Sequence, residues 1–254
     1  MPELARAFLR APLAHRGLHD RARGVIENSR AAARAAIAAG YGIECDIQRA
    51  ACGEAMVFHD DDLGRLTGRA GRVSGHSAAR LRDFGLTGGG ETIPTLAEFL
   101  ALVAGRAPLL IEVKDQDGAL GPRVGPLEAR VAELLAGYDG PAALMSFNPH
   151  SVAALAAAAP DRPRGLTSCA FADDEWPLAP ATRARLAALA DFETTGASFV
   201  SHDRADLANP AVTALKGRGV PILTWTVRTP RQEAAAREVA DNITFEGYAP
   251  AIAS

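Results

Sequence analysis

Cysteine is scarce in this chain, and the three residues present form no recognisable pattern. Cys45, Cys52 and Cys169 are scattered through 254 residues, and no two of them have CxxC spacing. An odd, unpatterned set argues against a disulfide framework and against a structural zinc site. Because it fits a reducing compartment, we expect a cytoplasmic protein.

A surplus of positive charge is also missing. The chain has 27 Lys and Arg against 30 Asp and Glu, which leaves a formal net charge of -3. This balance does not suit a surface that holds the many phosphates of a nucleic acid, so it argues against a general DNA or RNA binder. A local basic site for one small phosphate is still compatible with it.

Long apolar runs are absent as well. The chain has no uncharged apolar stretch of about 20 residues, the length that could span a bilayer. Glu3, Arg6 and Arg10 interrupt the N-terminus, where a signal peptide would need its apolar segment. With aromatic residues at only 6% of the chain, we expect no stable membrane association.

What the chain does contain is a regular alternation of extended and helical segments. Its hydrophobic content of 48% predicts a sizeable core, and its length suits one α/β barrel of about 250 residues. Nine extended runs are predicted at residues 12–14, 42–48, 55–58, 109–113, 142–145, 164–167, 198–200, 222–227 and 242–244. Helices are predicted at residues 29–39, 95–103, 127–136, 149–158, 181–191, 210–216 and 230–239.

The connection between the second and third runs decides how many strands form a barrel. Only residues 50–54 separate them, whereas a parallel crossover needs about a dozen residues or more. Ala55–Phe58 is therefore predicted to form a hairpin with Gly42–Gln48. The other eight runs alternate with helices, which predicts a (β/α)8 TIM barrel. An open doubly wound sheet is the competing architecture, but no G-x-G-x-x-G follows the first run.

Residues 60–90 differ in character from the rest. They are rich in Gly and Arg, and Thr87–Gly90 has the loop-like sequence TGGG. We expect residues 1–254 to form a single domain, in which residues 60–90 are a small loop insertion over the barrel mouth.

Polar residues gather at the ends of four predicted strands. The four groups are His15–Arg16–Gly17, Glu44-x-Asp46, His59–Asp60 and Glu112-x-Lys114. The carboxyl ends of barrel strands converge on one mouth, and residues two apart along a strand face the same side. We therefore expect these side chains to meet.

Three inward carboxylates predict a metal site. Glu44, Asp46 and Glu112 cannot all ionise in a confined site without compensation. A hard divalent cation, Mg2+ or Ca2+, is the usual compensation, because both ions take oxygen ligands.

Two histidines and two basic residues complete a set suited to cutting a phosphodiester. His15 and His59 titrate near neutral pH and suit an acid and a base. Arg16 and Lys114 supply fixed positive charge for a phosphate. Each feature alone has a simpler interpretation, such as a salt bridge or a turn at Gly17. Because these features occur together, each at the end of a predicted strand, a catalytic site is the favoured interpretation.

The order of these motifs resembles the glycerophosphodiester phosphodiesterase family. The matching residues are His15-Arg16, Glu27-Asn28, Glu44-x-Asp46, His59-Asp60, Glu112-x-Lys114, Ile93–Leu96, Ser146–Phe147 and Thr224–Val227. The resemblance implies a TIM barrel of the phosphatidylinositol phospholipase C-like phosphodiesterase type. It also implies hydrolysis of glycerophosphodiesters to glycerol 3-phosphate and an alcohol, with Mg2+ or Ca2+ bound.

The resemblance implies roles for individual residues. It makes His15 and His59 the acid–base pair and makes Glu44, Asp46 and Glu112 the metal ligands. Arg16, Lys114, Phe147 and Trp225 would contact substrate, although the two aromatic residues could equally pack the core. Glu27 and Asn28 would lie just outside the ligands, with Glu27 either an outer ligand or a partner of Arg16.

The chain departs from the family pattern at three places. Ile26 stands where the family usually has Pro, and Asn148 stands where Asp is common. The usual Thr-Asp-x-Pro near the C-terminus is Thr244–Gly247 here, and Glu246 could supply the missing carboxylate. None of these changes removes a predicted ligand or catalytic histidine.

The remaining histidines and the rival functions complete the expectations. His19 is close to His15 and could touch the site, but a surface loop is the favoured expectation; His76, His150 and His202 are expected in loops without an acidic partner at ligand spacing. Three alternatives stay open: a lysophospholipase D-type enzyme, a phosphodiesterase for inositol phospholipids, and a non-catalytic barrel that binds phosphorylated small molecules.

Overall fold

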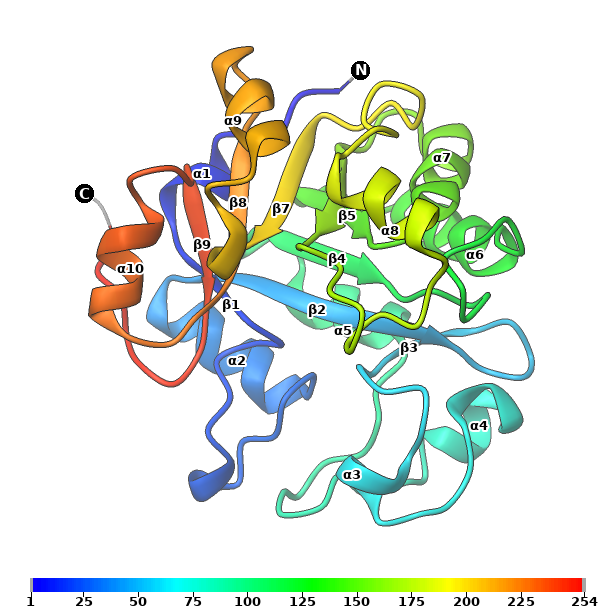
Figure 1. Ribbon diagram of the computed structural model, residues 1–254. Helices are drawn as coiled ribbons and strands as arrows, with labels where there is room; N and C mark the ends of the chain where they lie inside the picture. The colour runs from blue at the N-terminus through cyan, green and yellow to red at the C-terminus, as the bar shows by residue number, and fades with distance from the viewer. Residues whose placement is uncertain (1, 253–254) are drawn as a thin grey trace.

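Eight parallel strands form a closed barrel in the computed structural model, which describes residues 2–252. The pairing of β1 with both β2 and β9 closes the ring. The predicted (β/α)8 TIM barrel is confirmed (Figure 1). The barrel strands are β1 (Leu13–Ala14), β2 (Gly42–Arg49), β4 (Leu109–Val113), β5 (Ala142–Ser146), β6 (Arg164–Ser168), β7 (Phe199–Asp203), β8 (Ile222–Val227) and β9 (Asn242–Phe245).

The ninth strand, β3 (Ala55–Val57), lies outside the barrel as the short connection predicted. It pairs antiparallel with the end of β2, with Ile47 opposite Val57. The backbone N–H of Phe58 donates to the carbonyl of Asp46 at 2.9 Å. The hairpin therefore brings His59 back beside the carboxyl end of β2.

Helices connect the strands and cover the outside of the barrel (Figure 1). Proline stands in the first turn of each helix from α6 to α10, where its missing N–H costs no hydrogen bond. The helices are α1 (Ala7–Arg10), α2 (Arg30–Ala39), α3 (Gly64–Thr67), α4 (Ala78–Leu81), α5 (Leu96–Val103), α6 (Pro126–Leu135), α7 (Pro149–Ala158), α8 (Pro180–Ala187), α9 (Pro210–Gly217) and α10 (Pro230–Ala236), with 3-10 turns η1 (Arg21–Arg23), η2 (Val73–Gly75) and η3 (Arg204–Asp206). Among the described residues, no helix has the length and apolar character needed to cross a bilayer.

Two predicted helices are shorter in the structure than their sequence patterns indicated. The helix predicted to reach residue 191 ends at Ala187, because Leu189 adopts a φ of 50° that a right-handed helix cannot continue. The helix predicted to reach residue 239 ends at Ala236, where the chain turns toward β9.

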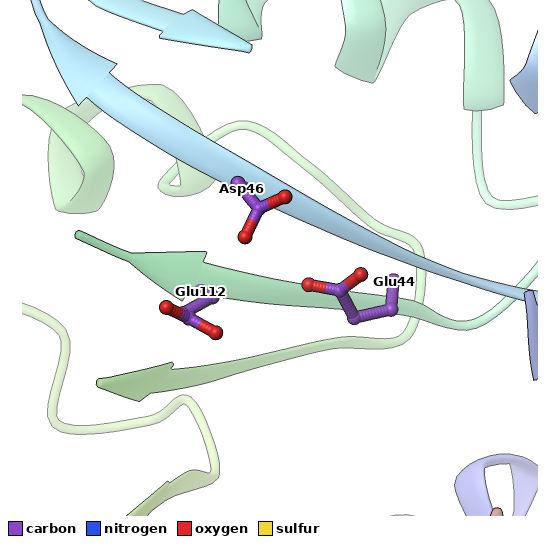
Figure 2. Close-up of side chains that lie close together, drawn as sticks. All are labelled: Glu44, Asp46 and Glu112. Atoms are coloured by element: carbon purple, nitrogen blue, oxygen red, sulfur yellow. The ribbon is translucent and has the colours of Figure 1, made fainter. Parts of the chain in front are cut away.

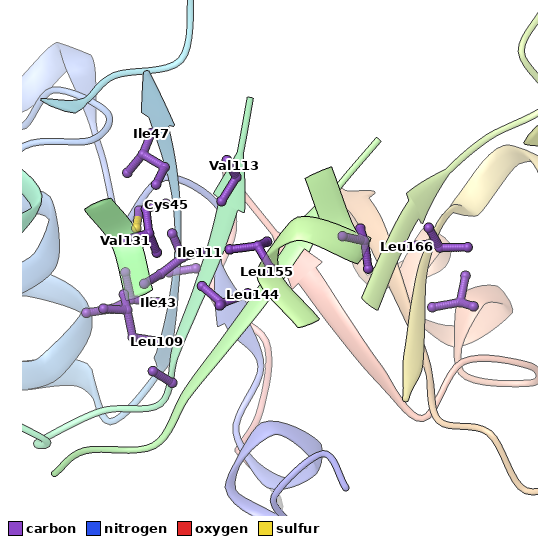
Figure 3. Packing of buried hydrophobic residues seen from close by; sticks show 14 of the residues in the cluster. Ile43, Cys45, Ile47, Leu109, Ile111, Val113, Val131, Leu144, Leu155 and Leu166 are labelled. Atoms are coloured by element: carbon purple, nitrogen blue, oxygen red, sulfur yellow. The ribbon is translucent and has the colours of Figure 1, made fainter. Parts of the chain in front are cut away.

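Alternation along the strands separates the barrel interior from an outer apolar layer. In β2, Ile43, Cys45 and Ile47 join the layer between strands and helices, part of which Figure 3 shows. A smaller interior cluster contains Leu4, Phe8, Leu13, Leu110, Ala143, Met145, Phe199 and Leu223. Asn242 donates to the carbonyls of Phe8 and Ala11 at 2.7 Å, which fastens the α1 segment to the amino-terminal end of β9. The polar mouth lies at the opposite end.

Residues 60–90 are more ordered than the expected loop. They contain α3, η2 and α4, and Figure 1 shows α3 and α4 apart from the outer helices. Their apolar side chains form a separate buried cluster with residues of β3 and neighbouring loops. The cluster contains Ile26, Ala50, Met56, Phe58, Leu63, Leu66, Val73, Leu81, Phe84, Leu86 and Ile93. This local core holds the segment against the end of the β2–β3 hairpin.

Candidate active site

Three carboxylates meet inside the barrel mouth. Glu44 and Asp46 face inward because they are two residues apart along β2. Glu112 pairs with Asp46 in the parallel register of β2 and β4. One ligand oxygen of each residue lies within 4.8 Å of the others, and Figure 2 shows the three side chains converging. Their exposed fractions are only 2%, 1% and 6%.

Burial and mutual repulsion oppose the ionisation of this cluster. Burial, together with the charges of Asp46 and Glu112, raises the pKa of Glu44 well above its ordinary value. Burial acts in the same direction on Asp46, but Lys114 and other nearby cations hold the pKa of Asp46 below its ordinary value. A hard divalent cation would compensate the remaining charge. The donor set therefore fits Mg2+ or Ca2+.

Lys114 is a fixed positive charge beside the carboxylates. Its ammonium lies 2.7 Å from Oδ1 of Asp46 and 2.5 Å from Oε1 of Glu112. Burial acts to lower the pKa of Lys114, but the two carboxylates raise it above its ordinary value. Positive charge on His59 or His15 also lowers the pKa of Asp46. The two predicted catalytic histidines therefore flank the same carboxylate.

His15 follows β1 and is held by a carboxylate from the end of β9. Its Nδ1 lies 2.6 Å from Oε2 of Glu246, and its backbone N–H donates to the carbonyl of Phe245 at 2.9 Å. Burial lowers the pKa of His15 although Glu246 acts to raise it. Glu246 thus makes a polar contact after the last strand, as the sequence suggested, and its partner is His15.

The loop between β1 and α2 supplies donors to the carboxylates. The backbone N–H of Arg16 donates to Glu44 at 2.9 Å, and the Asn28 amide donates to Asp46 at 2.8 Å. The Arg16 guanidinium binds Glu27 at 2.6 Å, while its Nε lies 3.4 Å from Asp46. Arg16 and Asn28 both have a φ of 55°, which costs a non-glycine residue about 1–3 kcal/mol. The surrounding structure therefore maintains strain at this loop.

His59 is held in a similar way at the end of the hairpin. Its Nδ1 lies 2.7 Å from Oδ1 of Asp60. Arg65 of α3 binds both oxygens of Asp60 and both oxygens of Glu27 at 2.6–3.0 Å. This guanidinium links the loop after β1 to the loop after β3. Sequence reasoning missed Arg65, because nothing in its local sequence distinguishes it from the other arginines of residues 60–90.

Phe147 and Trp225 belong to a cluster of four aromatic rings. Their ring centroids are 5.5 Å apart. Trp176, from the segment between β6 and α8, lies 5.0 Å from Phe147 and 4.9 Å from Phe171. Phe171 is buried, whereas the other three are partly exposed. Sequence reasoning missed Trp176 and Phe171, because their segment has no regular periodicity.

The expectation for His202 is wrong. This residue is fully buried in β7 and has two side-chain partners. Its Nδ1 lies 2.7 Å from Oγ of Ser168, and its Nε2 lies 3.0 Å from Oδ2 of Asp206. His202 alternates with the inward-facing Ser201, so it belongs to the layer between barrel and helices. His19 does approach the site, with its Nε2 at 3.7 Å from Glu246.

The fold is shared with several solved phosphodiesterases. A phosphodiesterase from Oleispira antarctica, solved with sn-glycerol-3-phosphate, is 23% identical over 94% of each chain, with a TM-score of 0.76. Glycerophosphodiester phosphodiesterases from Parabacteroides distasonis and Agrobacterium tumefaciens are 21% and 25% identical, with TM-scores of 0.74 and 0.67. The alignments cover 92% of each chain for the first and 96% for the second.

Sequence comparison identifies the family. No curated protein matches the chain. The model of the glycerophosphoryl diester phosphodiesterase family matches residues 15–243, which include every predicted ligand and both predicted catalytic histidines. The predicted class of enzyme, a phosphoric diester hydrolase, follows from this match. The chain therefore belongs to the glycerophosphoryl diester phosphodiesterase family.

Proposed function

We propose that this protein hydrolyses glycerophosphodiesters to glycerol 3-phosphate and an alcohol. The observation that carries the proposal is the cluster of three buried carboxylates and Lys114, flanked by His15 and His59. The Oleispira phosphodiesterase, which has the same fold, binds the product sn-glycerol-3-phosphate. That complex supports the same product here.

In this proposal Glu44, Asp46 and Glu112 hold Mg2+ or Ca2+. The bound ion would polarise the phosphate and add positive charge in the transition state. Lys114 and Arg16 bind phosphate oxygens from the side of the carboxylates. Phe147 and Trp225 contact the substrate where the mouth opens.

The two histidines act as base and acid. Each has its Nδ1 engaged by a carboxylate, Glu246 for His15 and Asp60 for His59, which leaves each Nε2 free for the substrate. One histidine removes the proton of the glycerol hydroxyl next to the phosphate, and that oxygen attacks phosphorus. The other histidine protonates the departing alcohol. Water then opens the cyclic phosphate while the histidines exchange roles.

The test is release of glycerol 3-phosphate from glycerophosphocholine and glycerophosphoethanolamine, with Mg2+, Ca2+ or EDTA. We expect release with a metal, none after chelation, and a loss of about a hundredfold or more in His15→Ala and His59→Ala. Trapping of a cyclic phosphate in a single turnover tests the first step. Metal-independent release, or full activity of the histidine variants, would contradict the proposal.

We also propose that residues 1–254 form one domain in which the 60–90 insertion orders the mouth. The contact that supports this is the Arg65 guanidinium, which joins Glu27 and Asp60. Arg65→Met should lower turnover. Arg72→Met, in the same insertion but paired with the exposed Asp61, should not. Equal activities of the two variants would argue against an ordering role.

A further inference from the structure

The aromatic cluster lies next to Lys114, which binds the phosphate in the proposed function. The part of the site around Lys114 and the three carboxylates is called the phosphate end. Glu112 pairs with Met145 in the register of β4 and β5. Two residues further along each strand are Lys114 and Phe147, which therefore face the same side. The hydroxyl of Ser146 donates to the carbonyl of Val113 at 2.7 Å and holds the two strand ends together there. Phe147 is thus the ring next to Lys114.

From Phe147 the aromatic surface continues over β6 to β8. Trp176 and Trp225 each pack on Phe147, with centroid distances of 5.0 and 5.5 Å. The buried ring of Phe171 packs against Trp176. All three outer rings retain exposed surface. A partly exposed aromatic surface therefore lies on the side of the mouth away from β1 and β2.

Carboxylates without a cationic partner stand beside these rings. Asp203 is the register partner of Trp225 in β7 and β8, and Glu175 directly precedes Trp176. Ser168 pairs with His202 in the register of β6 and β7, so Asp203 lies beside the end of β6, where burial first, and then the charges of Asp203 and Glu175, raise the pKa of Cys169 to about 11. Across residues 2–252 neither carboxylate forms a salt bridge. Near the phosphate end, five carboxylates do form one, namely Glu27, Asp46, Asp60, Glu112 and Glu246, whereas Glu44 instead accepts from the backbone N–H of Arg16.

We propose that this aromatic and acidic surface binds the alcohol part of the substrate and selects a small organic cation of the choline type. The surface consists of Phe147, Trp176, Trp225, Glu175 and Asp203. Aromatic faces attract quaternary ammonium groups, and unpaired carboxylates add a favourable field. An ethylene bridge joins phosphate to ammonium in such substrates, which suits two adjoining subsites. The inference rests on the proposed function, because it takes the phosphate position at Lys114 as its reference.

The test compares two esters that differ in charge and share a shape. We would measure kcat/KM of the full chain with divalent metal for glycerophosphocholine and for its neutral isostere, the 3,3-dimethylbutyl ester. The wild-type protein should prefer the choline ester by roughly tenfold. Trp176→Leu and Asp203→Asn should each reduce this preference severalfold, whereas Trp176→Phe should keep most of it. Asparagine can still accept from the N–H of Ala205, as Asp203 does at 3.0 Å.

A matched control separates this surface from a general effect of charge. Asp139 is exposed in the connection before β5, at the amino-terminal end of the barrel, so Asp139→Asn should keep the wild-type ratio. Equal hydrolysis of the two esters by the wild-type protein, or a ratio that both variants leave unchanged, would overturn this inference alone. Hydrolysis of neither ester would overturn the proposed function as well.

Discussion

The contact between His15 and Glu246 allows a prediction with a magnitude. The Nδ1–Oε2 distance of 2.6 Å indicates a short, charge-assisted hydrogen bond, a kind that contributes about 1.5–3 kcal/mol. Glu246→Gln keeps the size of the side chain and removes its charge. If the bond stabilises the imidazolium that forms during turnover, kcat should fall by about tenfold to hundredfold.

The assay is kcat and KM for glycerophosphocholine across a range of pH. KM should change little, because Glu246 orients His15 and does not contact substrate. Glu246 acts to raise the pKa of His15, so its replacement lowers that pKa further. His15 then stays neutral down to a lower pH. If His15 is the base of the first step, the acidic limb of the pH profile should therefore move to lower pH in the variant.

Arg228→Gln is the matched control for this prediction. Arg228 donates to the other oxygen of Glu246 at 2.7 Å but is half exposed, and such surface pairs contribute about 1 kcal/mol or less. Loss of the Arg228 charge should therefore lower kcat only severalfold. The reasoning is refuted if Glu246→Gln loses no more kcat than Arg228→Gln, or if its whole effect lies in KM.

Three further predictions concern metal, backbone and pH. Mg2+ or Ca2+ at about a hundred times its Kd should stabilise the fold by about 2.7 kcal/mol. The rise in Tm should vanish in Glu112→Gln, and a rise that persists would contradict the ligand assignment. Gly17 has a φ of 78°, and a Cβ there would lie 2.8 Å from Ala32. Urea unfolding should therefore show a larger loss for Gly17→Ala, about 1–3 kcal/mol, than for Gly53→Ala, where φ is 88° and nothing lies within 4 Å; equal losses would disprove the clash. Although burial opposes it, Arg65 and Arg16 lower the pKa of Glu27 from 4.5 to about 2. The stability from this ionised carboxylate should disappear as pH falls through that range, so Glu27→Gln should be less acid-sensitive than wild type; parallel urea midpoints would contradict it.

The barrel could be predicted because its signals are local. The five residues before Ala55 are too few for a crossover, and that count alone separated the hairpin from the eight barrel strands. Alternation in β2 likewise placed Glu44 and Asp46 on one face and Cys45 on the other. The helix within residues 181–191 was predicted too long, since the reversal of φ at Leu189 leaves no mark in a segment without Gly or Pro.

The candidate site was likewise predictable only where its residues lie at the ends of predicted strands. Glu44, Asp46, Glu112 and Lys114 stand at strand ends, so the convergence of parallel strands was enough to bring them together. The segment of residues 60–90 was expected to be a loop, because its small apolar cluster has no periodic pattern. Its Arg65 contacts Glu27 from 38 positions away, a separation over which sequence spacing carries no information.

By itself, the sequence determined the strand order, the inward carboxylates and the family, because these depend on periods of a few residues and on motifs. Tertiary structure alone decided which groups hold the two histidines and what surrounds the mouth. Glu246 reaches His15 across 231 positions, and Trp176 meets Phe147 from a segment without regular structure. The contact of His15 with Glu246 forms only when the closed barrel brings its first and last strands together, and the contact of Trp176 with Phe147 forms only when the segment after β6 packs over the end of β5.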